Sequence, residues 1–170
     1  MSDYRRLRIP GGHYFFTLVT KDRAPLFKGP AEVEVLRTAL RRVMRARPFR
    51  LQAMVVLPDH LHCIWQLPPG DADFSGRWRE VKKAVYRGLH RPVPQTGSIW
   101  QPRFWEHLLR DEDDWRRHMD YIHYNPVKHG LATSPLGWPW SSFRHCVARG
   151  WYEPDWGAGE PATIASMHPE

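Results

Sequence analysis

The chain has 170 residues, 42% of them hydrophobic, which is enough for one domain with a buried core and argues against two. No apolar run approaches the length of a membrane span and the first residues do not form a secretory signal, so we expect a cytoplasmic, nucleoid-associated protein without membrane contact. A net charge of +7, carried by 20 arginines and five lysines beside nine tryptophans, favours a nucleic-acid partner over an acidic membrane surface, because guanidinium groups bind phosphates and stack on bases.

The first half of the chain predicts a strand, a helix and a strand hairpin. A basic arm over residues 1–12 precedes a run of aromatic and β-branched residues at 13–20, which is typical of a buried strand. Apolar residues then recur at helical spacing over residues 31–47. Two further apolar runs within residues 51–67 are separated by a Pro-Asp break, which indicates two strands joined by a tight turn.

The second half predicts a helix, a strand, another helix and an irregular tail. Residues 75–90 carry an apolar stripe at helical spacing with basic residues beside it, and residues 103–110 are expected to form a fourth strand. The acidic residues 111–114 suit the N-terminus of a further helix. The tail over residues 131–170 is rich in tryptophan and proline, so we expect it to pack on the body, with its last ten residues disordered.

The order strand, helix, strand, strand, helix, strand is that of the split βαβ, ferredoxin-like arrangement. We therefore expect an α+β fold with one antiparallel sheet, two helices on one face of it, and an additional C-terminal helix. No internal repeat is visible, so residues 1–170 are expected to form a single domain.

The triplet His60-Leu61-His62 opens the second strand of the predicted hairpin. Successive strand side chains point to opposite faces, so His60 and His62 share one face about 7 Å apart. Taken alone, such a triplet is more often a pair of surface or partly buried histidines. Its place at the start of an otherwise apolar hairpin favours a metal or catalytic site, because polar groups there need a reason to be buried.

The helix after the fourth strand carries a second group of polar residues. At about 100° per residue, Tyr121 and Asn125 share one flank of its apolar stripe, whereas His123 lies on the other flank and Tyr124 points away from the core. Pro126 opposes helical geometry at Asn125, because the residue before a proline avoids the α region. Taken singly, Tyr121 is an amphipathic tyrosine at a helix–sheet boundary, and Asn125 is a helix cap.

Taken together, the histidine pair and the Tyr121-x-x-x-Asn125 spacing resemble the single-tyrosine HUH nucleases. Within that superfamily, four fragments are similar to the REP-associated tyrosine transposases. They are Val56-Leu-Pro-Asp-His-Leu-His62, Arg103-Phe-Trp-Glu-His107, Tyr121-Ile-His-Tyr-Asn-Pro-Val-Lys128 and Trp138-Pro-Trp-Ser-Ser-Phe143. The similarity covers nearly the whole chain, and four fragments in order at fitting separations make it specific.

The resemblance implies a DNA strand-transfer enzyme, a transposase and site-specific endonuclease, that cleaves and rejoins single-stranded or hairpin repeat DNA. The additional helix would then be the catalytic one, with Tyr121 as the nucleophile of a 5′-phosphotyrosine intermediate. His60 and His62 would hold a divalent ion, Mg²⁺ or Mn²⁺, and Asn125 would add a third ligand, with His123 in reserve. The enzyme would act as a monomer or a homodimer.

Basic residues elsewhere in the chain are candidates for contacts to DNA phosphates. They are Arg5, Arg6, Lys82, Lys83, Arg87, Arg103 and Lys128. For each of them a solvated surface is the competing interpretation, and a GC-rich genome also favours arginine whatever the function.

Two other functions stay open at this point. One is a metal-dependent nuclease that uses water, in which Tyr121 is structural. The other is a DNA- or RNA-binding module without chemistry. Intact His60, His62 and Tyr121 argue against the second, because binding alone needs none of them.

Overall fold

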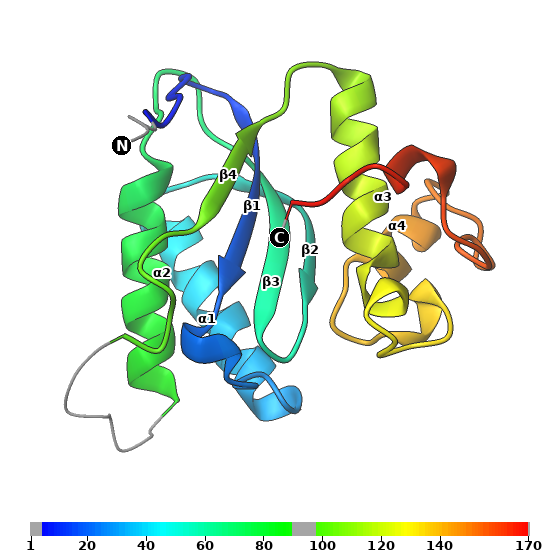
Figure 1. Ribbon diagram of the computed structural model, residues 1–170. Coiled ribbons are helices and arrows are strands. Elements are labelled where there is room, and N and C mark those ends of the chain that lie inside the picture. Colours follow the sequence, from blue (N-terminus) through cyan, green and yellow to red (C-terminus); the bar gives the residue numbers. More distant parts are fainter. Residues whose placement is uncertain (1–4, 90–97, 170) are drawn as a thin grey trace.

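The computed structural model describes residues 5–89 and 98–169 (Figure 1). Four strands form one antiparallel sheet in the order β2-β3-β1-β4: β1 is His13–Val19, β2 is Arg50–Val56, β3 is His60–Gln66 and β4 is Trp105–Leu108. The helices are α1 at Pro30–Ala46, α2 at Phe74–Gly88, α3 at Glu112–Lys128 and α4 at Phe143–Ala148. The element order and the strand order are those of the split βαβ arrangement, so the predicted α+β, ferredoxin-like fold is confirmed.

The sheet has a helix layer on each face. The helices α1 and α2 lie on one side of the sheet and α3 on the other (Figure 1). Phe16 and Trp65 belong to the core shared with α1 and α2, whereas Phe15 and Ile64 belong to the core shared with α3. Because side chains alternate along a strand, residues 60 and 62 of β3 share the face of Ile64. The first and second helices therefore cover one face, as expected, and the additional helix lies over the face that carries the histidine pair.

The helix α3 extends past Pro126, where the sequence suggested that it would be disrupted. It begins after Asp111, whose side chain accepts a hydrogen bond from the backbone N–H of Asp114 at 2.8 Å, and it continues through Pro126 to Lys128. Asn125 therefore stays in helical register. Proline removes one helical hydrogen bond, and the packing of α3 against the sheet outweighs that loss.

Residues 131–169 cover the outer side of α3. Asp120 accepts hydrogen bonds from the hydroxyls of Tyr152 and Thr163, each at 2.7 Å, and Ile164 is buried in the same core. Tyr124 is only 9% exposed beneath this segment, so the expectation that it points away from the core is wrong. After α4, the chain runs back to the sheet (Figure 1). There the hydroxyl of Thr17 in β1 donates to the carbonyl of Pro169 at 3.0 Å.

Within the described ranges, no helix has the length and apolar character needed to span a bilayer. The predicted basic arm is described from Arg5 onward, since residues 1–4 lie outside those ranges.

A buried guanidinium joins the end of α1 to the start of α2. Arg77 is 1% exposed and donates to the Asp71 carboxylate at 2.7 and 3.0 Å, and to the carbonyls of Arg47, Pro48 and Asp73 at 2.9 to 3.1 Å. The hydrogen bond from Arg77, followed by one from the backbone N–H of Asp73, lowers the pKa of Asp71 to about 2. Because this pKa is depressed in the folded state, the stabilisation is present above the unfolded pKa of about 4 and is lost as the pH falls towards 2.

We expect Arg77→Met to lower the free energy of unfolding at pH 7 by about 3 kcal/mol, because it removes the hydrogen bonds that the guanidinium donates to one carboxylate and three carbonyls. Urea unfolding measures this loss, and the difference from wild type should shrink between pH 4 and pH 2. The control is Arg79→Met, an exposed position on the same helix, which should change stability by no more than about 0.5 kcal/mol. Equal effects of the two substitutions would show that the buried guanidinium contributes nothing specific.

Candidate active site

The strand β3 brings His60 and His62 together on the face covered by α3. Their ring centroids are 5.0 Å apart, and the two residues are 2% and 0% exposed. This separation is shorter than the spacing expected along a strand, because the two rings lean towards one another. The pair is therefore a buried, converging pair of imidazoles and not a surface feature.

Two neighbouring side chains fix the orientation of these rings. Asp59 Oδ1 lies 2.6 Å from Nδ1 of His60. Burial alone would raise the pKa of Asp59, but the contact with His60 and the nearby Arg23 guanidinium bring it below its usual value, so the carboxylate is ionised and accepts. The Nδ1 nitrogen of His60 is thus the protonated one.

Thr17 plays the same part for His62. Its hydroxyl donates its one proton to the carbonyl of Pro169 at 3.0 Å, so at 2.8 Å it accepts from Nδ1 of His62. Both rings therefore carry their proton on Nδ1, and the lone pair is on Nε2. This is the arrangement that metal-ligating histidines commonly have, with a second group holding the nitrogen that does not bind the ion.

The helix α3 places Tyr121 against this pair. The Tyr121 ring centroid lies 5.2 Å from that of His62 and 6.1 Å from that of Phe15, and the side chain is 1% exposed. Lys128, two turns further on, donates from Nζ to the Tyr121 hydroxyl at 3.2 Å and lies 4.8 Å from the ring centroid. A phenol, an ammonium and two imidazoles thus meet in one place.

The two candidates for a third ligand, the amide of Asn125 and the imidazole of His123, lie on different flanks of α3. Asn125 is fully buried one helical turn beyond Tyr121, on the same flank. His123 lies among the C-terminal residues: its Nε2 is 2.8 Å from Ser142 Oγ, and burial lowers its pKa to about 3. The structure therefore does not bring His123, the reserve ligand, to the histidine pair.

Three residues at this site were not predicted from the sequence. His129 follows the last residue of α3, and its ring centroid lies 5.0 Å from that of His60. Its position next to Lys128 could have pointed to it. Because the helix was expected to weaken at Pro126, however, the direction of residue 129 could not be predicted. Asp59 and Thr17 were likewise missed as orienting groups, although Asp59 directly precedes His60.

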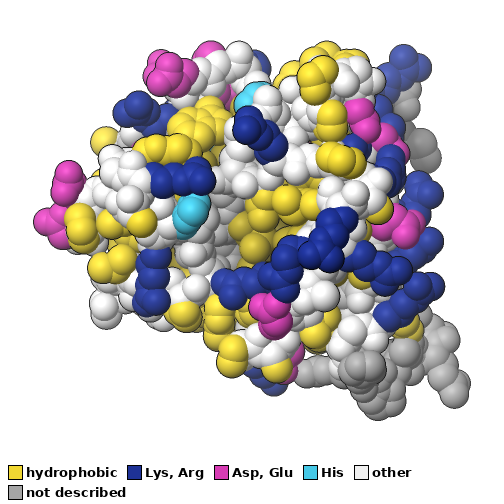
Figure 2. Space-filling model, turned by 180° about the vertical axis from the view of Figure 1, so that it is seen from behind, with side chains coloured by type: hydrophobic (Ala, Val, Ile, Leu, Met, Phe, Trp, Pro, Cys, Tyr) yellow, Lys and Arg dark blue, Asp and Glu magenta, His cyan; other side chains and the backbone are white. Residues whose placement is uncertain are grey.

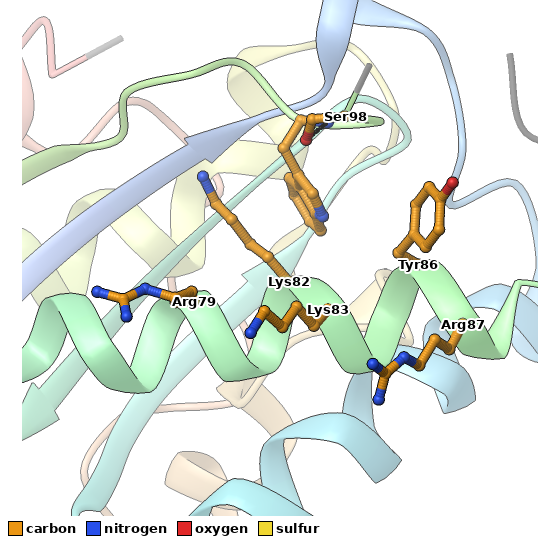
Figure 3. Close-up of a pocket in the computed structure, with 7 residues that line it drawn as sticks. Arg79, Lys82, Lys83, Tyr86, Arg87 and Ser98 are labelled. Atoms are coloured by element: carbon orange, nitrogen blue, oxygen red, sulfur yellow. Dashed lines mark hydrogen bonds between the residues drawn. The ribbon is translucent and has the colours of Figure 1, made fainter. Parts of the chain in front are cut away.

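Three of the seven predicted phosphate contacts lie on the opposite side of the sheet from the histidine pair. Lys82, Lys83 and Arg87 extend from α2 and line a groove of about 380 Å³ together with Arg79 and Trp100 (Figure 3). Burial, with a smaller contribution from Arg6, lowers the pKa of Lys82 to about 8. Figure 2 shows Lys and Arg side chains gathered over the part of the molecule formed by α1 and α2.

The other three candidates are placed differently. Arg5 and Arg103 are exposed. Arg6 pairs with the buried Glu106 at 2.9 Å and lies 4.0 Å over the Phe104 ring, so it is engaged within the fold.

The chain resembles known proteins over most of its length. The family model described as "Transposase IS200 like" matches residues 9–123. A REP-associated tyrosine transposase of Escherichia coli is 49% identical over 156 residues, which cover 92% of this chain and 91% of the relative. A relative from Haemophilus influenzae is 40% identical over 170 residues, covering 95% and 96%. A solved structure of a REP-associated tyrosine transposase bound to a REP hairpin matches with a TM-score of 0.84 and 46% identity, covering 96% of both chains.

Proposed function

Because this chain belongs to the IS200-like transposases and, within them, to the REP-associated tyrosine transposases, we propose that it cleaves and rejoins single-stranded or hairpin repeat DNA through a covalent bond to Tyr121. The observation that carries this proposal is the convergence of three buried rings, with centroids 5.0 Å apart for His60 and His62 and 5.2 Å apart for His62 and Tyr121. Binding alone requires no such arrangement. The solved relative holds a REP hairpin, which makes a hairpin of that kind the first substrate to test.

We propose that His60 and His62 bind a divalent ion, Mg²⁺ or Mn²⁺, through Nε2, with Asn125 as the third ligand. The donor set fits such an ion, because both rings are held with their lone pair on Nε2. Imidazoles and an amide are uncharged, so they leave the positive charge uncompensated, and Mn²⁺ accepts nitrogen ligands more readily than Mg²⁺. When bound, the ion polarises the scissile phosphate and stabilises the charge that builds up on its oxygens.

The protein groups divide the rest of the reaction. The Tyr121 oxygen attacks phosphorus in line, which forms a bond between the tyrosine oxygen and the 5′-phosphate and breaks the bond to the 3′-oxygen of the neighbouring nucleotide. The phenol loses its proton, and the departing strand gains one as a 3′-hydroxyl. The Lys128 ammonium, 3.2 Å away, stabilises negative charge developing on the phenol oxygen. Because the phosphotyrosine retains the bond energy, the hydroxyl of another strand can reverse the step and join DNA.

Access to the site requires movement. His62 is 0% exposed and Tyr121 1% exposed, and Thr17 holds the carbonyl of Pro169 beside them. A phosphate therefore reaches Nε2 only after the residues that cover it have moved.

The remaining basic residues are proposed to hold the DNA backbone at a distance from the chemistry. Lys82, Lys83 and Arg87 line one groove, and Arg5 and Arg103 are exposed. Contacts to phosphate release counterions, so binding carried by these residues should weaken as salt is raised. Two of the predicted residues are left out of this set. Lys128 contacts the Tyr121 hydroxyl, and Arg6 is paired with Glu106.

A labelled hairpin oligonucleotide with a single-stranded flank, incubated with the protein and Mn²⁺ and run on a denaturing gel, tests the proposal. We expect a shortened strand with a free 3′-hydroxyl and a second labelled species that migrates with the protein. Cleavage without a protein-linked species would instead favour the nuclease that uses water. Binding without cleavage at any divalent ion would favour the module without chemistry.

Asp59→Asn tests the orientation of the metal-binding pair. An asparagine can present either oxygen or N–H₂ to Nδ1 of His60, so the ring loses its fixed tautomer. We expect the Mn²⁺ concentration for half-maximal cleavage to rise about 10-fold to 100-fold, with the rate recovered at saturating Mn²⁺. Asp22→Asn, at an exposed acid of the short turn Lys21–Arg23 after β1, is the matched control and should leave this concentration unchanged. An unchanged Mn²⁺ requirement in Asp59→Asn would show that the ring is oriented by something else.

A further inference from the structure

A second group of metal-ligating side chains lies between β4 and α3, separate from the pair on β3. His107 comes from β4, and Asp114 and His118 come from the first two turns of α3. Each of the three offers one ligand atom, and these atoms all lie within 4.8 Å of one another. The Nε2 of His107 is 2.9 and 3.1 Å from the two carboxylate oxygens of Asp114, and Nδ1 of His118 is 3.3 Å from one of them.

The surroundings fix the protonation of the Asp114 carboxylate and of the His118 ring. Nδ1 of His118 donates to the backbone carbonyl of Asp114 at 2.7 Å, which leaves the lone pair on Nε2. Burial lowers the pKa of His118, so its ring is neutral near pH 7. Burial would raise the pKa of Asp114, but hydrogen bonds from His107 and the backbone N–H of Arg110 bring it below its usual value, so this carboxylate is ionised.

The cluster is largely buried, and His107 is its most exposed member. The rings of His107 and His118 stack with centroids 4.7 Å apart, and the His118 ring packs against that of Phe15 with centroids 4.7 Å apart. The side chains of Asp114 and His118 are 11% and 10% exposed, whereas that of His107 is 27% exposed. An ion can therefore enter past His107. Arg110, which lies 3.6 Å from the same carboxylate, is 75% exposed and free to turn into solvent.

We propose that His107, Asp114 and His118 form a second metal site, which takes a borderline divalent cation such as Zn²⁺. Two imidazoles and one carboxylate are a frequent donor set for such ions, and bonds of about 2.0 to 2.2 Å place adjacent ligand atoms at separations near those between His107 and Asp114. Binding requires His107 to carry its proton on Nδ1, which frees Nε2 for the ion, and requires the His118 ring to turn so that its Nε2 faces the carboxylate. The ion would join the edge strand β4 to α3. It would also hold His118 against Phe15, whose ring centroid lies 5.5 Å from that of His62, and so support the packing behind the His60–His62 pair.

The test counts ions in the absence of DNA, so its outcome is independent of whether the protein cleaves a hairpin. The untagged full chain is dialysed against buffered Zn²⁺ and the bound metal is measured. We expect His60→Ala/His62→Ala to retain one tightly bound equivalent. Adding His107→Gln to that double variant should remove saturable binding, whereas adding His145→Gln, at an exposed histidine of α4, should not.

Thermal unfolding gives a second measurement on the same variants. Zn²⁺ should raise the Tm of His60→Ala/His62→Ala, because an ion that binds only the folded state stabilises it, and should not raise the Tm of the triple variant with His107→Gln. The proposal is overturned if the folded double variant binds no Zn²⁺, or if the triple variant binds it with unchanged affinity. His107 is the most exposed of the three ligands, so we expect the protein to stay folded when it is replaced. Loss and retention of Zn²⁺ binding can then both be measured on a folded variant.

Discussion

Replacement of Tyr121 by phenylalanine should lower the rate of hairpin cleavage at least about a thousandfold and abolish the protein–DNA adduct. Phenylalanine keeps the ring that packs against His62 and Phe15 and removes only the hydroxyl that receives the Lys128 hydrogen bond. The loss should therefore fall on the chemical step. Hairpin affinity, measured by fluorescence anisotropy, and the Tm should stay close to the wild-type values.

Tyr124→Phe is the matched control for this experiment. Tyr124 lies three residues further along the same helix and is also buried, at 9% exposure, but it packs beneath the C-terminal residues and not against the histidine pair. Its loss should leave both cleavage and adduct intact. If Tyr121→Phe still cleaves while the adduct is absent from wild type, water is the nucleophile and the tyrosine is structural.

The double substitution His60→Ala/His62→Ala has the second large expected effect. It removes both proposed ring ligands, so we expect cleavage to fall at least about a thousandfold and not to recover when Mn²⁺ is raised. Binding of the hairpin should change by no more than about threefold, because backbone contacts supply most of the affinity for DNA. Gel assays over a Mn²⁺ series, with anisotropy on the same variant, measure both quantities.

His145→Ala, at an exposed histidine, controls for the loss of an imidazole in general. Cleavage and adduct formation that survive in His60→Ala/His62→Ala would remove the metal site from the mechanism. A variant that loses hairpin affinity as well as cleavage would show that the pair shapes the DNA surface and has no separate catalytic part.

The fold was predictable because its signals are local. Alternation, helical spacing and the Pro-Asp break define the order of elements, and this order allows few topologies. The pairing of His60 with His62 also follows from strand geometry alone. That Tyr121 meets them follows from the flank of α3 on which it lies, once α3 is known to cover that face of the sheet.

The parts that could not be predicted depend on tertiary packing. The rule for residues before proline is a local preference, and the contacts of α3 with the sheet and with residues 131–169 override it at Asn125. Continuation of the helix is what brings Lys128 to the tyrosine and His129 to His60. Thr17 is 45 residues away from His62 in sequence, so only the β1–β3 register could reveal their contact.

The central claim is that Tyr121 becomes covalently bound to DNA, and peptide mapping tests it most directly. Trypsin cuts after Arg117 and Lys128, so a single peptide, residues 118–128, contains both Tyr121 and Tyr124. After reaction of wild type with hairpin DNA and Mn²⁺, nuclease trimming and tandem mass spectrometry, we expect a 5′-phosphonucleotide on Tyr121. The same mass on Tyr124, or cleaved DNA with this peptide unmodified, would contradict the account.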